Sequence, residues 1–218
     1  MALRVVVEAT PKRVFASALD WPGWSRGAKT EDGALTALLE YADRYAPVAR
    51  RARVRFDPPA TLRGVSVVER LEGGAGTDFG IPSVPSASED GALDARELKR
   101  LVALLRGSWA EFDGAAKKAH GVSLRLGPRG GGRQVPKMVE HVREAEAAYV
   151  AQLGTKVPGS SSIEQLRDAF LAALQARAAG WEPPDPNKVR KRWLPRYAVR
   201  RSAWHALDHA WEIQDRSS

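Results

Sequence analysis

Cysteine is absent from this chain of 218 residues. Its absence excludes disulfide frameworks, thiolate metal sites, iron–sulfur clusters and cysteine nucleophiles together. Long apolar runs are also missing, and a helix needs about 20 consecutive apolar residues to cross a bilayer. The amino terminus lacks the apolar stretch and small-residue cleavage site of a secretory signal. We therefore expect a cytoplasmic protein with no membrane partner.

Histidine is scarce, with only four in the chain, while hydrophobic residues make up 44% and charged residues 28%. That balance is typical of a folded globular protein rather than a disordered one. Because cysteine is missing, any metal or acid–base site must draw on the four histidines or on carboxylates.

Positive charge is concentrated in one part of the chain. Residues 1–91 carry 12 basic and 12 acidic side chains, so the whole net charge of +8 lies in residues 92–218. The excess is greatest over residues 188–201. Such a cluster is compatible with a contact surface for phosphate or carboxylate groups and, as the less favoured reading, for nucleic acid.

The hydrophobic pattern changes character along the chain, which predicts an α+β fold in two parts. In the first part, strands are expected over residues 3–8, 13–19 and 61–71, with a helix over 31–53. In the second part, amphipathic helices are expected over about 93–119, 136–153, 162–178 and 195–215. The division predicts a small α+β domain at 1–72, a Gly-, Pro- and Ser-rich linker at 73–91, and a four-helix bundle at 92–218.

Three histidines lie on inward faces of the expected bundle. His205 and His209 are four residues apart, so their imidazoles lie on one helical face within reach of one ion. His141 lies in the apolar stripe of the second bundle helix, which directs it toward the core. Such a spacing also arises by chance, but the inward-facing third histidine favours a three-histidine site for a divalent metal, with positions open for water or substrate.

Charged residues accompany each of these histidines. Glu144 follows His141 by three residues and Glu212 follows His209 by three, a spacing that allows a carboxylate to hold the second ring nitrogen. Acids at such positions are also commonly exposed. Arg201 precedes His205 by one helical turn and is the candidate for binding an anionic substrate group beside the metal.

The histidine segments VEHVREAE (139–146) and RRSAWHALDHAWEIQDR (200–216) resemble those of the DinB/YfiT-like superfamily of metal-binding four-helix bundles. The resemblance covers about residues 92–218. It implies that His141, His205 and His209 bind a divalent metal, commonly zinc or nickel. It also implies a thiol-dependent transferase or isomerase, with a low-molecular-weight thiol as cosubstrate.

The first part resembles a different family. Its segments ALDWPGW (18–24) and TEDGAL (30–35) are similar to the strand, Pro-Gly turn and alanine-rich helix of HicB-like domains. HicB proteins are antitoxins that usually carry a separate DNA-binding tail, and no such tail is recognisable here. This resemblance therefore implies a fold and leaves the role of the domain open.

Three hypotheses about function follow from these observations. The first is a metal-dependent enzyme of the DinB/YfiT-like type that acts on a small, anionic substrate. The second is a non-enzymatic regulatory protein that binds nucleic acid or another partner, with any metal structural. The third is a bundle in which the metal serves only as a structural clip.

Overall fold

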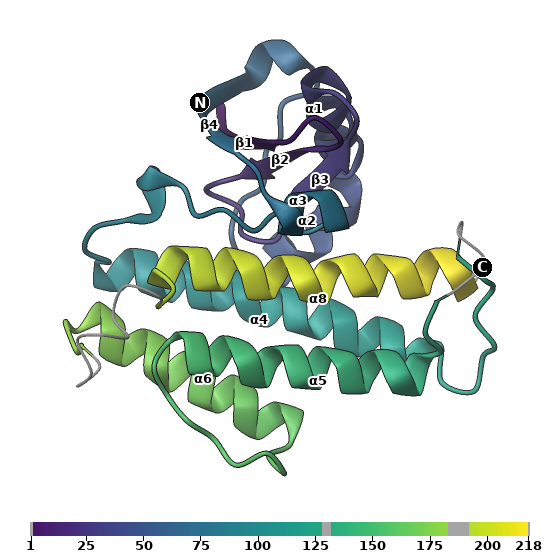
Figure 1. The fold of residues 1–218 in the computed structure, drawn as a ribbon, viewed down its shortest axis with the longest axis vertical. Coiled ribbons are helices and arrows are strands. Elements are labelled where there is room, and N and C mark those ends of the chain that lie inside the picture. Colours follow the sequence, from purple (N-terminus) through teal and green to yellow (C-terminus); the bar gives the residue numbers. More distant parts are fainter. Residues whose placement is uncertain (1, 128–131, 183–191, 218) are drawn as a thin grey trace.

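The computed structural model describes residues 2–127, 132–182 and 192–217 (Figure 1). A four-stranded sheet with helices forms the amino-terminal unit, and a helical region follows it. The predicted α+β fold is confirmed. None of the described helices is long and apolar enough to span a membrane.

The sheet has the strand order β3-β2-β1-β4. Its strands are β1 (Leu3–Ala9), β2 (Val14–Ala18), β3 (Ser25–Ala28) and β4 (Val65–Glu72). Strand β1 pairs antiparallel with β2 and parallel with β4, while β2 pairs antiparallel with β3. Because side chains alternate between the two faces of a strand, Val5 and Val7 point into one hydrophobic cluster, and Glu8 points to the opposite face.

Strand β3 is an element that the sequence did not predict. Its four residues, SRGA, have no β-branched or aromatic side chain, so β-propensity gave no signal. The strand forms because it pairs with β2 across the turn that contains Trp21 and Trp24. The amino-terminal unit therefore has three strands before its helices, where two were expected.

The single helix expected over 31–53 is two helices, α1 (Glu31–Glu40) and α2 (Ala42–Arg51). Thr30 caps α1, because its side chain accepts a hydrogen bond from the Gly33 backbone N–H. The helical hydrogen bonding is interrupted at Tyr41, whose ring lies under the Arg26 guanidinium, 3.9 Å from it. The interruption allows α2 to change direction and pack against the bundle.

Residues 73–91, expected to be a linker, contain the short helix α3 (Ala75–Phe79) and a 3-10 turn at Ala87–Glu89. The buried carboxylate of Glu8 holds this segment on the sheet. It accepts hydrogen bonds from the Thr77 hydroxyl and from the backbone N–H groups of Ser83 and Val84, each of the latter at 3.0 Å. The segment is thus attached to the sheet, and the domain boundaries at 72 and 92 stay predictions.

Replacing Glu8 with alanine should lower the free energy of unfolding by about 2–3 kcal/mol. The change leaves the backbone N–H groups of Ser83 and Val84 without their buried acceptor, and an unsatisfied buried donor is costly. Urea denaturation at neutral pH measures the loss. Glu72, an exposed residue of β4, provides the control, and equal effects of the two alanine variants would contradict this role for Glu8.

The four bundle helices lie close to their expected positions. They are α4 (Ala95–Lys118), α5 (Val135–Gln152), α6 (Ile163–Ala178) and α8 (Pro195–Ser217). Asp94 and Ser162 cap α4 and α6 through their side chains. In Figure 1, α8 runs between the amino-terminal unit on one side and α5 and α6 on the other.

The central position of α8 joins the two parts of the molecule. Leu207 and Trp211 of α8, with Leu104 of α4, belong to the same hydrophobic cluster as Val5 and Leu38 of the amino-terminal unit. Other residues of α8, including Ala203 and Ala206, lie in the core of the bundle. Helix α8 is therefore buried on nearly all sides, and its polar residues face other protein groups or a cavity.

Candidate metal centre

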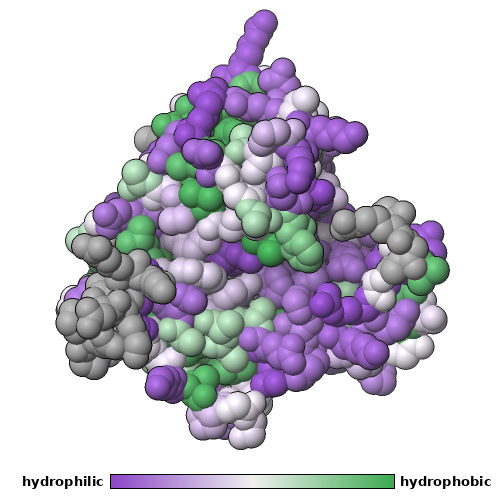
Figure 2. Space-filling model, viewed as in Figure 1, coloured by the Kyte–Doolittle hydropathy of each residue, from purple (hydrophilic) through white to green (hydrophobic). Residues whose placement is uncertain are grey.

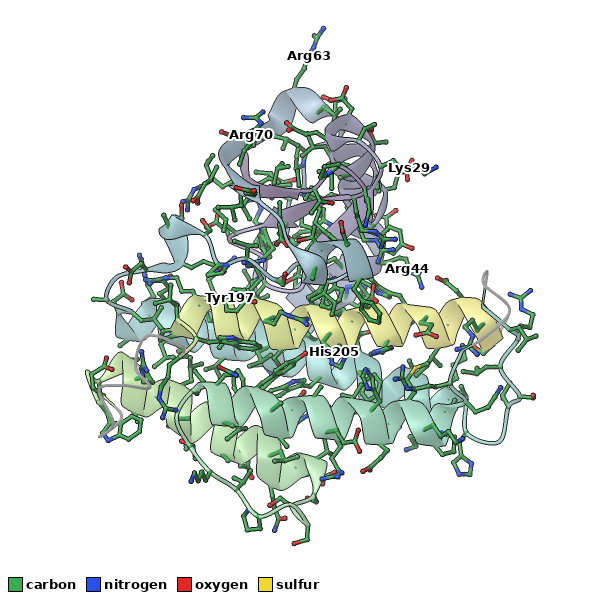
Figure 3. The ribbon with its side chains drawn as sticks, viewed as in Figure 1. Lys29, Arg44, Arg63, Arg70, Tyr197 and His205 are labelled. Carbon is green, nitrogen blue, oxygen red and sulfur yellow. The ribbon has the colours of Figure 1, made fainter. Side chains whose placement is uncertain are left out.

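The three candidate histidines come together between α5 and α8. His205 and His209 lie one turn apart on α8, and His141 approaches from α5. Figure 3 places His205 between these two helices. One ligand nitrogen from each of the three rings lies within 4.8 Å of the other two. The prediction that the three side chains meet is confirmed.

The distances among the rings suit a shared ion. The Nε2 atoms of His141 and His205 are 3.2 Å apart. Two imidazole nitrogens that bind one tetrahedral zinc ion lie about 3.3 Å apart. The ring of His209 has its centroid 5.1 Å from that of His141 and 4.7 Å from that of His205.

Burial favours the neutral form of the imidazoles. The side chain of His205 lies in the protein with 8% of the residue exposed. Burial lowers its pKa well below the usual value, and the neighbouring His209 and Arg201 lower it further. Burial also lowers the pKa of His141, with a smaller contribution from Arg133. Neutral imidazole is the form that binds a metal ion.

Glu212 fixes the orientation of one histidine. Its Oε2 atom lies 3.0 Å from Nδ1 of His209, and its Oε1 accepts a hydrogen bond from Arg216 at 2.6 Å. The hydrogen bond from His209 and the nearby Arg216 lower the pKa of the Glu212 carboxyl. An ionised carboxylate at Nδ1 keeps the proton there and leaves Nε2 free to bind a metal.

The other acids near the histidines behave differently. Glu144 is exposed, and within the described ranges it makes no hydrogen bond to His141. Asp208 lies on the histidine helix but pairs with Arg26 of β3, with 3.3 Å between Nη1 and Oδ1. Burial raises the pKa of Asp208. Of the two glutamates proposed as hydrogen-bond partners of the histidines, only Glu212 lies within hydrogen-bond distance of its histidine.

The histidines line a cavity of about 570 Å³. All three contribute to its wall, together with Tyr149 of α5 and Trp204 of α8. On the face shown in Figure 2, hydrophilic residues gather where the amino-terminal unit meets the helices beneath it. The volume lies within the usual range of small-molecule sites.

Arg201 also lines this cavity, as its position before His205 predicted. The residue is 8% exposed, and its guanidinium packs over the rings of Trp204 and Tyr149, at 4.7 and 5.5 Å from their centroids. Among the described residues it has no hydrogen-bond or ion-pair partner, and its Nη1 atom is buried without one. An unpaired buried guanidinium is a strong binder of carboxylate or phosphate.

Sequence reasoning missed the contribution of the amino-terminal unit to this cavity. Arg13, Phe15 and Arg26 come from the sheet and its turns, and Gly80 and Ile81 follow α3. These residues lie well over 50 positions from the histidines in the sequence. No local spacing or motif relates them to the site, and only the packing of α8 against the sheet brings them to it.

The basic cluster at 188–201 does not form one free surface. Arg196 makes a two-pronged ion pair with Glu97, and Arg200 makes a buried one with Glu89 at 2.6 and 2.9 Å. Lys188, Arg190 and Lys191 lie outside the described residues. The described arginines of the cluster thus mainly hold α8 to neighbouring segments or face the cavity.

No family model, curated protein or solved structure matches this chain.

Proposed function

We propose that this chain is a metal-dependent enzyme in which His141, His205 and His209 hold one divalent ion, zinc or nickel. The observation that carries the proposal is the meeting of three imidazoles at the wall of a cavity. Three histidine ligands leave coordination positions for water or substrate, an arrangement typical of catalytic rather than structural zinc sites.

The donor set fits such an ion. The ligand nitrogens lie within 4.8 Å of one another, and burial holds His141 and His205 in the neutral form. Imidazole suits both zinc and nickel. A bound divalent ion supplies Lewis acidity, which lowers the pKa of a water or thiol at its open position.

We propose a small-thiol-dependent transferase or isomerase as the reaction class. The resemblance of the histidine segments to DinB/YfiT-like proteins supports this class. A thiol cosubstrate would itself supply the nucleophile, so this reaction needs no cysteine from the protein, in agreement with a chain that has none. In this reaction Arg201 binds an anionic group of the substrate, and Glu212 holds the proton of His209 at Nδ1.

Metal content tests the proposal most directly. Purified protein should hold close to one equivalent of zinc or nickel, measured by mass spectrometry of the metals after gel filtration. Chelation should abolish the transfer or isomerisation activity found in a screen with small thiols, and added metal should restore it. Protein that contains no metal after purification and also fails to bind added zinc or nickel would contradict the metal site.

Replacing Glu212 with glutamine should weaken metal binding about 10- to 100-fold, the usual effect of losing a carboxylate that orients a metal-binding histidine. A competition titration with a coloured zinc chelator measures the change. Glu144→Gln is the matched control, because Glu144 is exposed and has no hydrogen bond to His141 within the described ranges. Equal affinities of the two variants would remove Glu212 from the site.

The two alternative functions predict other results. A protein that binds nucleic acid through residues 188–201 should bind a duplex in a salt-dependent manner with the metal removed. The ion pairs of Arg196 and Arg200 reduce the free charge available for this. A metal that serves only as a structural clip should have a closed set of protein ligands, and the cavity beside the histidines disfavours this.

A further inference from the structure

The cavity beside the histidines has a strong excess of positive charge. Among the residues that the structure describes, four arginines line it, Arg13, Arg26, Arg133 and Arg201, against a single carboxylate, that of Asp208. Asp208 is already paired with Arg26. The histidines add no compensating negative charge, so this excess favours an anionic ligand.

Two of these arginines belong to different parts of the molecule. Arg201 comes from α8 and lies buried beside His205, without a hydrogen-bond or ion-pair partner in the described ranges. Arg13 comes from the turn before β2 in the amino-terminal unit. The cavity is therefore formed by both units, and its charged groups sit on opposite sides of their junction.

Arg13 lies against the backbone at Gly80, where the missing side chain leaves room for its guanidinium. Gly80 has a φ of +105°, and a Cβ atom there would lie only 3.0 Å from Nη1 of Arg13. The neighbouring Asp78 is held by the Thr10 hydroxyl at 2.5 Å and by Lys12 at 3.3 Å. Within the part of the chain that the structure describes, the Arg13 guanidinium has no ion pair of its own. The Arg13 guanidinium does act on Asp78, since it helps to lower the pKa of that carboxyl. Arg13 is thus a half-buried cation on the cavity wall, close to Asp78 but not ion-paired with it.

We propose that this cavity binds a small molecule with two anionic groups, one held by Arg201 near the histidines and the other by Arg13 of the amino-terminal unit. Carboxylate and phosphate groups share the chemistry that guanidinium recognises. Phe15, Ile81 and Trp204 also line the cavity and suit a short hydrocarbon chain between the two groups. The amino-terminal unit then determines which substrate binds. The closeness of the first anionic group to a metal rests on the proposed function.

Isothermal titration of the full chain with dicarboxylates from succinate to suberate tests this proposal. Each is compared with the monocarboxylate of the same chain length, in zinc-loaded protein and again after chelation. We expect one dicarboxylate to bind at least tenfold more tightly than its partner. If no dicarboxylate reaches this tenfold advantage in either state, the proposal is overturned. The test uses the unmodified protein, so it does not depend on whether any variant folds.

Substitutions assign the two subsites. Arg13→Gln should remove the advantage of the best dicarboxylate and leave the monocarboxylate unchanged, whereas Arg201→Gln should weaken both. Arg63→Gln is the matched control, because Arg63 projects from the far tip of the amino-terminal unit (Figure 3). If Arg133→Gln removes the advantage and Arg13→Gln does not, the assignment of the second subsite is overturned.

Two further measurements separate the possible outcomes. Exchanging one carboxylate of the best ligand for a phosphonate tests whether the second anionic group is a phosphate or a carboxylate. The ligand that binds more tightly, phosphonate analogue or dicarboxylate, identifies the group that the site prefers. A dicarboxylate preference that persists in chelated protein, together with a failure to bind zinc or nickel, would support the two-arginine site and overturn the proposed metal enzyme. The failures of the two proposals are therefore distinguishable.

Discussion

Replacing His209 with alanine is expected to weaken zinc binding by roughly a hundredfold or more. In small zinc sites about 10 kcal/mol or more of binding free energy is shared among a few ligands, so the loss of one ligand removes a large part of it. His209 supplies one of the three nitrogens that lie within 4.8 Å of one another. Zinc affinity is measured by competition with a chelator at neutral pH, and any metal-dependent activity should fall with it.

The fold should tolerate this substitution. The side chain of His209 is 12% exposed, and alanine is the residue most favourable in a helix. Circular dichroism should therefore show unchanged helix content. His120→Ala is the matched control, because His120 is exposed just beyond the end of α4. A His209→Ala protein that binds zinc as tightly as the His120→Ala protein would refute the three-histidine site.

Glu146 should make the protein less stable as the pH rises through neutrality. Its carboxyl lies in the interior of the bundle with 1% of the residue exposed, and its Oε2 atom has no hydrogen-bond partner. The nearest cation is Arg167, whose Nε is 4.0 Å away and whose guanidinium also pairs with Asp113. Burial raises the pKa of Glu146 to about 7, although Arg167 opposes the shift.

The direction of the effect follows from proton binding. Between the unfolded pKa of 4.5 and the folded pKa of about 7, the folded protein keeps a proton on Glu146 that the unfolded chain has lost. The free energy of unfolding therefore falls as the pH rises across this interval, by about 3 kcal/mol in all. Glutamine mimics the protonated carboxyl, so Glu146→Gln should remove this contribution.

Urea denaturation of both proteins between pH 4.5 and pH 8, with a chelator present, measures the contribution. The difference in unfolding free energy between Glu146→Gln and the unmodified chain should grow with pH. Both proteins contain the same histidines, so the pH dependence that histidine titration contributes is absent from this difference. Glu140→Gln is the control, since Glu140 is a surface residue paired with Arg143 on the same helix. A constant difference across this range would show that Glu146 is ionised in the folded protein throughout.

The sequence by itself determined the features that depend on local pattern. Hydrophobic spacing located the four bundle helices to within a few residues of their observed ends. A four-residue spacing on one helix also ensured that His205 and His209 face the same way. The position of His141 in an apolar stripe indicated that it faces the core, whereas its meeting with the other two depends on how α5 packs against α8.

Features that depend on pairing with distant residues were decided only by the tertiary structure. Strand β3 has weak intrinsic preference and forms because β2 is beside it. Residues 73–91 read as a linker from composition, yet Glu8 holds them on the sheet. From the sequence, Arg196 and Arg200 belong to a cluster of positive charge. In the structure they form ion pairs with Glu97 and Glu89.

The candidate site shows the same division. Arg201, His205 and His209 were predictable as a group, because helical periodicity relates residues that are close in sequence. His141 was predictable only as an inward-facing residue of another helix. The contribution of Arg13 was not predictable, because no periodicity connects it with a helix almost 190 residues later. Helix α8 is buried between the sheet and the bundle, so it must satisfy contacts on both sides. That packing, which depends on the shape of both units at once, sets Arg13 on the wall of the same cavity as the histidines.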